Sequence, residues 1–296
     1  MLRILGTGFA ALAGLAFGSF LNVCLSRWPV GESVVAPRSH CRSCGHTLAW
    51  WENVPLASWL ALRGRCRGCG ARIGWRYPLV ELAVGTLWAA CAWPFTGQLL
   101  QPSASAVEVY AGLTAMLGGM ILYWLLVALA VLDAEQFWLP DRLTWPGIAL
   151  GFVYSVLASW LSRQSLPSSS LHATSAHAAV ASLVAIAAAG GLILFIRWVY
   201  WLIRRHEGIG LGDAKLMALL AAWLGFSGAL VAFGLGVFLG ALVALGILAF
   251  SSARKDAKEW ALTKLPLGTF LCVGGIVSGL WGKPIIAAYL RWTGLH

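Results

Sequence analysis

Aspartates are the residues whose type and spacing most directly suggest chemistry in this chain. The sequence holds four aspartates in 296 residues, and three of them, Asp133, Asp141 and Asp213, stand beside long apolar segments. Burying a carboxylate at such a boundary is costly, so each is a candidate functional group. If Asp133 and Asp213 meet, they would share one proton, because like charges repel in a poorly hydrated site. The ionised carboxylate could then activate a water molecule while the protonated one donates to a substrate carbonyl.

The residues alone leave three interpretations of these aspartates open. The first is hydrolysis, and the second is a proton or cation pathway, for which acids beside a membrane are equally suited. The third is helix capping. Asp141 and Asp213 each precede an apolar run, and aspartate favours the N-cap position. The glycines before Asp213, which are Gly208, Gly210 and Gly212, exceed what a cap needs and would let an extended peptide approach the carboxylate. No partner acid lies deep in an apolar segment, which favours hydrolysis over transport.

Four cysteines form a second candidate site. Cys41 and Cys44 make one CxxC pair, Cys66 and Cys69 make another, and 21 residues separate the two pairs. Each pair turns two thiolates to one face, so together they can close a tetrahedral shell around zinc. Two disulfides are the alternative, although a reducing compartment would oppose them. A closed shell of four thiolates leaves no open position, so the predicted zinc is structural.

The composition identifies the class of protein that must position these residues. Apolar residues make up 59% of the chain and charged residues 11%, and the mean hydropathy is +0.78. No ordinary soluble domain has this balance, so we expect an all-α polytopic membrane protein. Its apolar runs predict about eight transmembrane helices, of which the sixth is short. They lie near residues 4–26, 79–95, 108–132, 143–162, 177–203, 214–225, 227–250 and 265–282.

Three segments follow from this pattern. Residues 1–26 form the first transmembrane helix. Residues 27–77, rich in Arg, Cys, Gly and Trp, form a small zinc-ribbon-like cytoplasmic domain between the first and second helices. Residues 78–296 form a transmembrane bundle that carries the aspartates. A transporter or channel with a zinc-ribbon regulatory loop is the competing class.

The distribution of positive charge predicts the orientation. The basic segments 27–76, 204–215 and 254–264 fall on one side of the membrane if the N-terminus is outside, and Asp133 and Asp141 fall on that side too. Cytoplasmic loops collect Lys and Arg, so the active site should face the cytoplasm. The net charge of +10 is then explained by topology and by attraction to anionic lipids, and nucleic-acid binding is not expected.

Several blocks of the chain, in order, make it resemble a known family, the bacterial prepilin peptidases, which are membrane aspartic proteases with a GxGD motif. Besides the paired CxxC motifs, the blocks are GSFLNVCLSRWP (18–29), RYPLVE (76–81), LDAEQFWLPDRLT (132–144), GIGLGDAKL (208–216) and PLGTFL (266–271). The resemblance implies that Asp133 and Asp213 are the catalytic pair. It makes Gly210, Gly212, Lys215 and Asp141 supporting motif positions.

The resemblance also implies a reaction, partners and a cell location. Members of the family cleave the leader of type IV prepilins and type II secretion pseudopilins on the cytoplasmic face of the bacterial inner membrane. Many then methylate the new N-terminal amine with S-adenosylmethionine, an activity linked to the insertion that carries the cysteines. The expected cofactors are therefore a structural zinc ion and S-adenosylmethionine, with the donor bound within residues 27–77.

Overall fold

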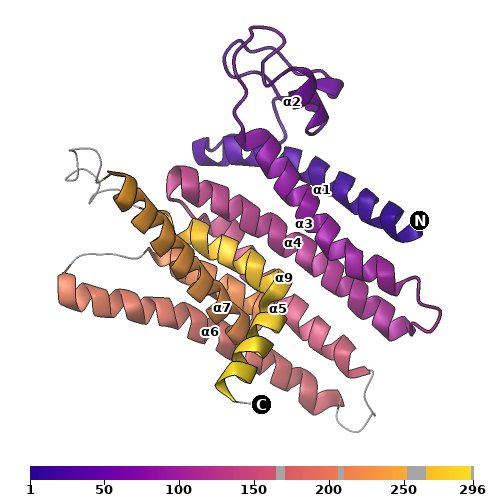
Figure 1. Cartoon of the computed structure of the whole chain (residues 1–296), viewed down its shortest axis with the longest axis vertical. Coiled ribbons are helices and arrows are strands. Elements are labelled where there is room, and N and C mark those ends of the chain that lie inside the picture. Colours follow the sequence, from indigo (N-terminus) through magenta and orange to yellow (C-terminus); the bar gives the residue numbers. More distant parts are fainter. Residues whose placement is uncertain (165–170, 206–209, 252–264, 295–296) are drawn as a thin grey trace. The chain divides into compact units, whose positions relative to one another are not determined.

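The computed structural model describes residues 1–164, 171–205, 210–251 and 265–294, and it is built from helices (Figure 1). Within those ranges there is no β-strand, only two isolated antiparallel bridges. The all-α prediction is confirmed. Gly208 and the basic segment 254–264 lie outside the described residues. In chain order the long helices are α1 (Leu2–Arg27), α3 (Arg76–Gln98), α4 (Ala106–Gln136), α5 (Asp141–Gln164), α6 (Leu171–Arg204), α7 (Leu211–Ser251) and α9 (Leu267–Thr293); the short ones are η1 (Trp28–Val30), η2 (Trp50–Asn53) and α2 (Ala57–Ala61).

All seven long helices are long and apolar enough to cross a membrane. The prediction of a polytopic membrane protein therefore agrees with the structure, but about eight spans were expected. The difference lies in α7, which contains both the predicted sixth span, 214–225, and the predicted seventh, 227–250.

A glycine divides α7 into two segments. Gly225 has a φ of 72° and a ψ of 173°, a conformation that interrupts the helix and that glycine adopts without strain. The contacts of α9 show how the second segment runs. A Cβ at Gly236 would lie 3.1 Å from Leu271, and the Ser278 hydroxyl donates a hydrogen bond to the Gly228 carbonyl oxygen at 2.8 Å. Residue numbers rise along α9 while they fall along this part of α7, so the two are antiparallel.

Leu139, in the connection between α4 and α5, locates the start of α7. A Cβ placed on Gly212 or on Gly268 would lie 3.1 Å from atoms of the Leu139 side chain. The first segment of α7 therefore begins level with the N-terminal end of α9, and the second segment returns toward that level. The first segment has about 14 residues and is about 21 Å long, shorter than the roughly 30 Å hydrocarbon core of a bilayer. The predicted short sixth span is therefore a helix of about two-thirds of the full crossing length, followed by a reversal.

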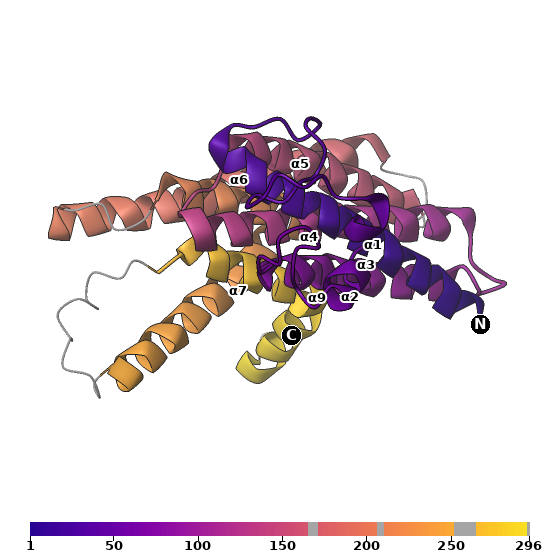
Figure 2. The ribbon, with the colours of Figure 1, turned by 90° about the horizontal axis from the view of Figure 1, so that it is seen from above.

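The chain forms two compact units, Met1–Ala128 and Leu129–His296, and α4 contributes to both. In the first unit α1 and α3 lie side by side (Figure 1, Figure 2). A Cβ at Gly18 would come 2.7 Å from the Glu81 Cα, so only glycine allows this close approach. The four-cysteine segment, between the end of α1 and the start of α3, belongs to this unit.

The first segment of α7 forms the core of the second unit. The helix packs against α5, α6 and α9, and Leu216, Met217, Leu219 and Leu220 are fully buried. The Trp223 indole N–H donates to a backbone carbonyl oxygen of α5 at 2.9 Å. Asp213 lies in the first turn of this buried segment, so the position of its carboxylate depends directly on the packing of the unit.

Candidate active site and metal centre

Asp133 lies in the last turn of α4 and is 6% exposed. Its Oδ2 atom accepts a hydrogen bond from the backbone N–H of Thr269 at 2.7 Å and lies 3.2 Å from the Thr269 hydroxyl. Thr269 is in the first turn of α9, where backbone N–H groups lack helical partners and the helix dipole is positive. One end of α9 therefore holds the Asp133 carboxylate.

Asp213 lies in the first turn of α7 and is 9% exposed. Its Oδ2 atom accepts a hydrogen bond from the Gly210 N–H at 3.2 Å. The sequence left open that Asp213 is the N-cap of this helix. It is not, because α7 begins at Leu211, and the Asp213 side chain reaches back to the residue before the helix. Gly210 thus supports the carboxylate directly, and Gly212 makes room for Leu139.

The structure brings Asp133 and Asp213 into one site. A Cβ at Gly268 would lie 2.9 Å from the Asp133 carboxyl carbon and 3.1 Å from Leu139, whose side chain also contacts Gly212. The two carboxylates are close enough for their charges to act on each other. Both charges also act on Cys272, which is buried in α9. Two carboxylates that are about 80 residues apart in the chain therefore lie in the same part of the second unit.

Asp141 has a different place in the structure. It is the first residue of α5, after Pro140, so it is not the N-cap either, and its carboxylate pairs with the Lys215 ammonium group of α7. The Asp141 side chain is 62% exposed and that of Lys215 is 30% exposed, so we expect the pair to contribute no more than about 1 kcal/mol. Its effect is to tie the start of α5 to the start of α7, beside Asp213.

Thr269, Gly268 and Leu139 were not predicted as site residues. Thr269 and Gly268 lie in the PLGTFL block and Leu139 in the LDAEQFWLPDRLT block; both blocks carry the family resemblance, but it assigned no role to these three residues. Their roles depend on contacts with α4 and α7 across long stretches of chain. The available signal was Pro266 with Thr269 three residues later at the start of a predicted helix, because that helix end offers unpaired N–H groups.

The four cysteine sulfurs converge in the first unit. They all lie within 4.8 Å of one another, and the Cys41–Cys69 and Cys44–Cys66 pairs are each 3.9 Å apart. Zn–S bonds of about 2.3 Å in a tetrahedron require sulfurs about 3.8 Å apart, whereas a disulfide bond requires about 2.05 Å. The donor set and its spacing therefore fit zinc and do not fit two disulfides.

The two CxxC turns have the same local geometry. In each, the first cysteine accepts a hydrogen bond from a glycine N–H four residues later, from Gly45 to Cys41 at 2.9 Å and from Gly70 to Cys66 at 2.8 Å. Both glycines have a φ near 72°, which favours glycine. Backbone N–H groups of Cys44 and Ser43 lower the pKa of the Cys41 thiol to about 6, so it is readily available as a thiolate.

His40 and His46, beside the first CxxC turn, each contact an oxygen atom away from the cysteine sulfurs. His46 Nε2 lies 3.2 Å from Glu52 Oε2, which also accepts the Ala49 N–H at 2.7 Å. That N–H and His46 hold the pKa of Glu52 below its usual value, so Glu52 is ionised at neutral pH. His40 Nδ1 is 3.0 Å from the Arg38 carbonyl oxygen. Four sulfurs complete a tetrahedron without either histidine.

Two protein-family models match consecutive parts of the chain. The Bacterial Peptidase A24 N-terminal domain matches residues 12–95, and the Type IV leader peptidase family matches residues 120–245. The first match includes all four clustered cysteines. The second includes Asp133, Asp141 and Asp213.

Several curated proteins that resemble the chain are named prepilin leader peptidase/N-methyltransferase. The protein from Pseudomonas putida is 33% identical over 96% of this chain and 94% of its own length. Those from Pseudomonas aeruginosa and Burkholderia pseudomallei strain 1026b are 32% and 35% identical, over 96% and 93% of this chain and 93% and 85% of their own lengths. No solved structure matches the chain.

These relatives are named as enzymes, and none of the three as a transporter or channel. They extend over nearly the whole chain, including the cysteine cluster and both halves of the aspartate site. The family that the motif blocks indicated is thereby confirmed: the chain belongs to the type IV leader peptidase family.

Proposed function

We propose that this protein is a membrane aspartic endopeptidase that removes the leader of type IV prepilins and type II secretion pseudopilins and then methylates the new N-terminal amine. The observation that supports the peptidase proposal is that the buried carboxylates of Asp133 and Asp213, from helices far apart in the chain, are near enough for their charges to interact. The names of the relatives support both activities.

The geometry suggests a division of labour between the two aspartates. Asp133 Oδ2 has two potential donors, the Thr269 N–H and hydroxyl, at the positive end of α9, whereas Asp213 accepts one N–H from Gly210. We assign Asp133 as the ionised base that takes a proton from the attacking water. Asp213 then donates its proton to the oxygen of the scissile carbonyl. As the tetrahedral intermediate collapses, a proton passes to the leaving amine, which becomes the new N-terminus.

We propose the bacterial inner membrane as the location, with the active site facing the cytoplasm. The C-terminal end of α4 and the N-terminal ends of α5, α7 and α9 all contribute residues to the site. The basic segments at 27–76 and 204–215 adjoin helix ends on the side predicted to be cytoplasmic. The leader would reach the carboxylates from that side.

We propose that Cys41, Cys44, Cys66 and Cys69 hold one zinc ion in the 27–77 segment. The ion would crosslink two turns of a segment that has little core of its own, and a closed shell of thiolates gives it no part in hydrolysis. Residues 27–77 would then serve the methyltransferase activity, residues 1–26 would anchor them, and residues 78–296 would carry the peptidase site.

Replacing either central aspartate by asparagine should abolish leader removal. We expect Asp133→Asn and Asp213→Asn each to lower the cleavage rate of a co-expressed prepilin by at least about a thousandfold, because each removes one half of the acid–base pair. Glu108→Gln, the same change at the far end of α4, should cleave normally. Wild-type cleavage by either aspartate variant, measured by the size of the pilin, would refute the catalytic assignment.

Thr269 should act as a positioning residue for Asp133. We expect Thr269→Val, which keeps the shape and the N–H but removes the hydroxyl, to lower kcat about tenfold or more while KM stays nearly constant. Thr269→Ser should restore most of the rate. If the valine variant keeps the wild-type kcat, the hydroxyl has no part in orienting the carboxylate.

Zinc should be present in the purified protein at about one ion per chain. Elemental analysis of a Cys41→Ser/Cys66→Ser variant should find it lost, because two ligands cannot close the shell. Cys91→Ser, which changes a cysteine of α3 outside the cluster, should retain it. A wild-type preparation that is free of zinc and still methylates pilin would contradict the proposal.

A further inference from the structure

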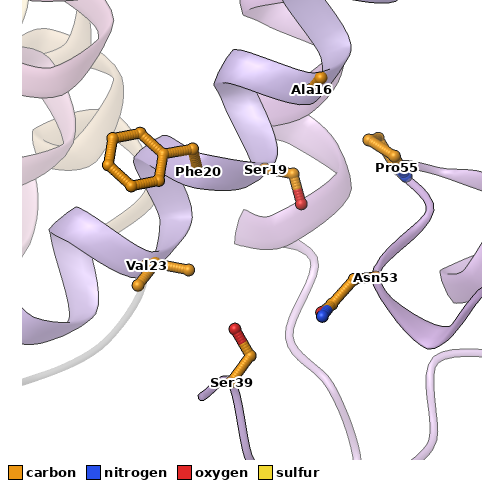
Figure 3. Close-up of a pocket in the computed structure, with 7 residues that line it drawn as sticks. All are labelled: Ala16, Ser19, Phe20, Val23, Ser39, Asn53 and Pro55. Carbon is orange, nitrogen blue, oxygen red and sulfur yellow. The ribbon is translucent and has the colours of Figure 1, made fainter. Parts of the chain in front are cut away.

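Two adjoining hollows lie in the first unit, between α1 and the segment that carries the cysteines. They measure about 260 and 270 Å³ and share Phe20, Val23, Ser39 and Asn53 as lining residues. Figure 3 shows Ser19, Ser39 and Asn53 pointing their polar ends into the space, with the Phe20 ring at one side. The proposed peptidase reaction makes no use of these hollows, because both of its carboxylates belong to the second unit.

A buried arginine forms part of the wall of the second hollow. Arg27, in the last turn of α1, is 6% exposed, and its guanidinium group donates to the carbonyl oxygens of Ser33 at 2.8 Å and Pro37 at 2.7 Å. Both acceptors are neutral, and no carboxylate of the described residues pairs with Arg27. Burying a charge without a counter-ion is costly. A guanidinium group has five N–H donors, so donors remain for a ligand.

The charges around the hollows favour an anion at the arginine end. The negative end of the α1 dipole is equivalent to only about half an elementary charge, and Arg38 adds a second guanidinium group to the wall. Among the described residues, no aspartate or glutamate lines either hollow. The Glu81 carboxylate hydrogen-bonds with Ser19, which lines the first hollow alone. It would therefore repel an anion from that end.

The walls beside the arginines are apolar, which limits the kind of anion. Phe20 and Val23 of α1 and Val34, Val35 and Pro37 of the following segment line the second hollow. Phe20 is 47% exposed and Val35 is 87% exposed. The segment Leu2–Val30 is a candidate membrane span, so this hollow lies at the end of a span, where lipid headgroups begin. An anion that also carries apolar chains matches both the charges and the walls.

We infer that these hollows bind an anionic phospholipid whose headgroup carries hydroxyl groups, such as phosphatidylglycerol. Its phosphate would lie between Arg27 and Arg38, and an acyl chain would run along Phe20. The hydroxyl groups of its headgroup would hydrogen-bond with Ser39 and Asn53. The lipid would supply the counter-ion that Arg27 lacks and would join the end of α1 to residues 33–39. Its binding should therefore stabilise the folded protein.

The test is native mass spectrometry of the full-length protein, purified in detergent and titrated with phosphatidylglycerol. We expect Arg38→Gln, which removes one charge from the wall, to bind the lipid about tenfold more weakly than wild type, or worse. Arg63→Gln removes the same charge from an exposed arginine of the same segment that lines neither hollow. It should bind within about twofold of wild type, because exposed charges are screened. Phosphatidylcholine, whose headgroup has no net charge, should bind weakly to all three proteins.

A second variant separates the shape of the site from its charge. Ser39→Leu leaves the net charge unchanged and fills part of both hollows, and we expect the same loss of lipid binding. Equal losses in Arg38→Gln and Arg63→Gln would overturn the inference, because general positive charge would then hold the lipid.

Thermal unfolding distinguishes the lipid from a soluble anion. Phosphatidylglycerol should raise the unfolding midpoint of the wild-type protein, and inorganic phosphate should not. An equal rise with inorganic phosphate would also overturn the inference, because the hollows would then need only a phosphate group. The unfolding midpoints in phosphatidylcholine should be the same for the wild type and the three variants, which shows that the variants are folded.

Discussion

Two carboxylates that share a poorly hydrated site repel each other, and the second unit is organised around holding them together. The strongest local compensation is the N-terminal end of α9, which gives Asp133 the N–H of Thr269 at 2.7 Å. Leu139 sets the spacing, because it fits against Gly212 on one side and Gly268 on the other. A Cβ at Gly268 would come 2.9 Å from the Asp133 carboxyl carbon and would displace it, and one at Gly212 would press on Leu139 at 3.1 Å. The site therefore depends on close packing of helix ends as much as on the two acids.

The reversal at Gly225 allows α7 and α9 to contribute to the same site. If α7 were one continuous helix of 41 residues, its end would lie about 60 Å from its start. Instead, its second segment runs antiparallel to α9 and returns toward the level of Asp213. The chain can then begin α9 beside Asp133. The short first segment is fully buried at several positions, so packing within the protein replaces the lipid contacts of a full span.

Features with a strong local signature were predictable from the sequence. The CxxC spacing predicted a cluster that the structure contains, because each turn is built from residues a few positions apart. The apolar runs predicted the helices, and Gly225 lies at the predicted boundary between the sixth and seventh spans. The pairing of Asp133 with Asp213 required the resemblance to a family, since nothing local to either residue indicates the other. Thr269 was missed because its contact with Asp133 joins residues 136 positions apart. The helices that carry Asp141 and Asp213 were expected to begin near residues 143 and 214 but begin at Asp141 and Leu211, so neither aspartate is at the N-cap position that was one of the open alternatives.

The account makes the two aspartates one chemical unit, and comparing single and double replacements tests this most directly. The cleavage rate of a purified prepilin should be measured for Asp133→Asn, for Asp213→Asn and for the double variant. Because neither acid can work without the other, the double variant should be no slower than the slower single variant. Independent losses that multiply in the double variant would contradict a shared site and would separate the two residues in function.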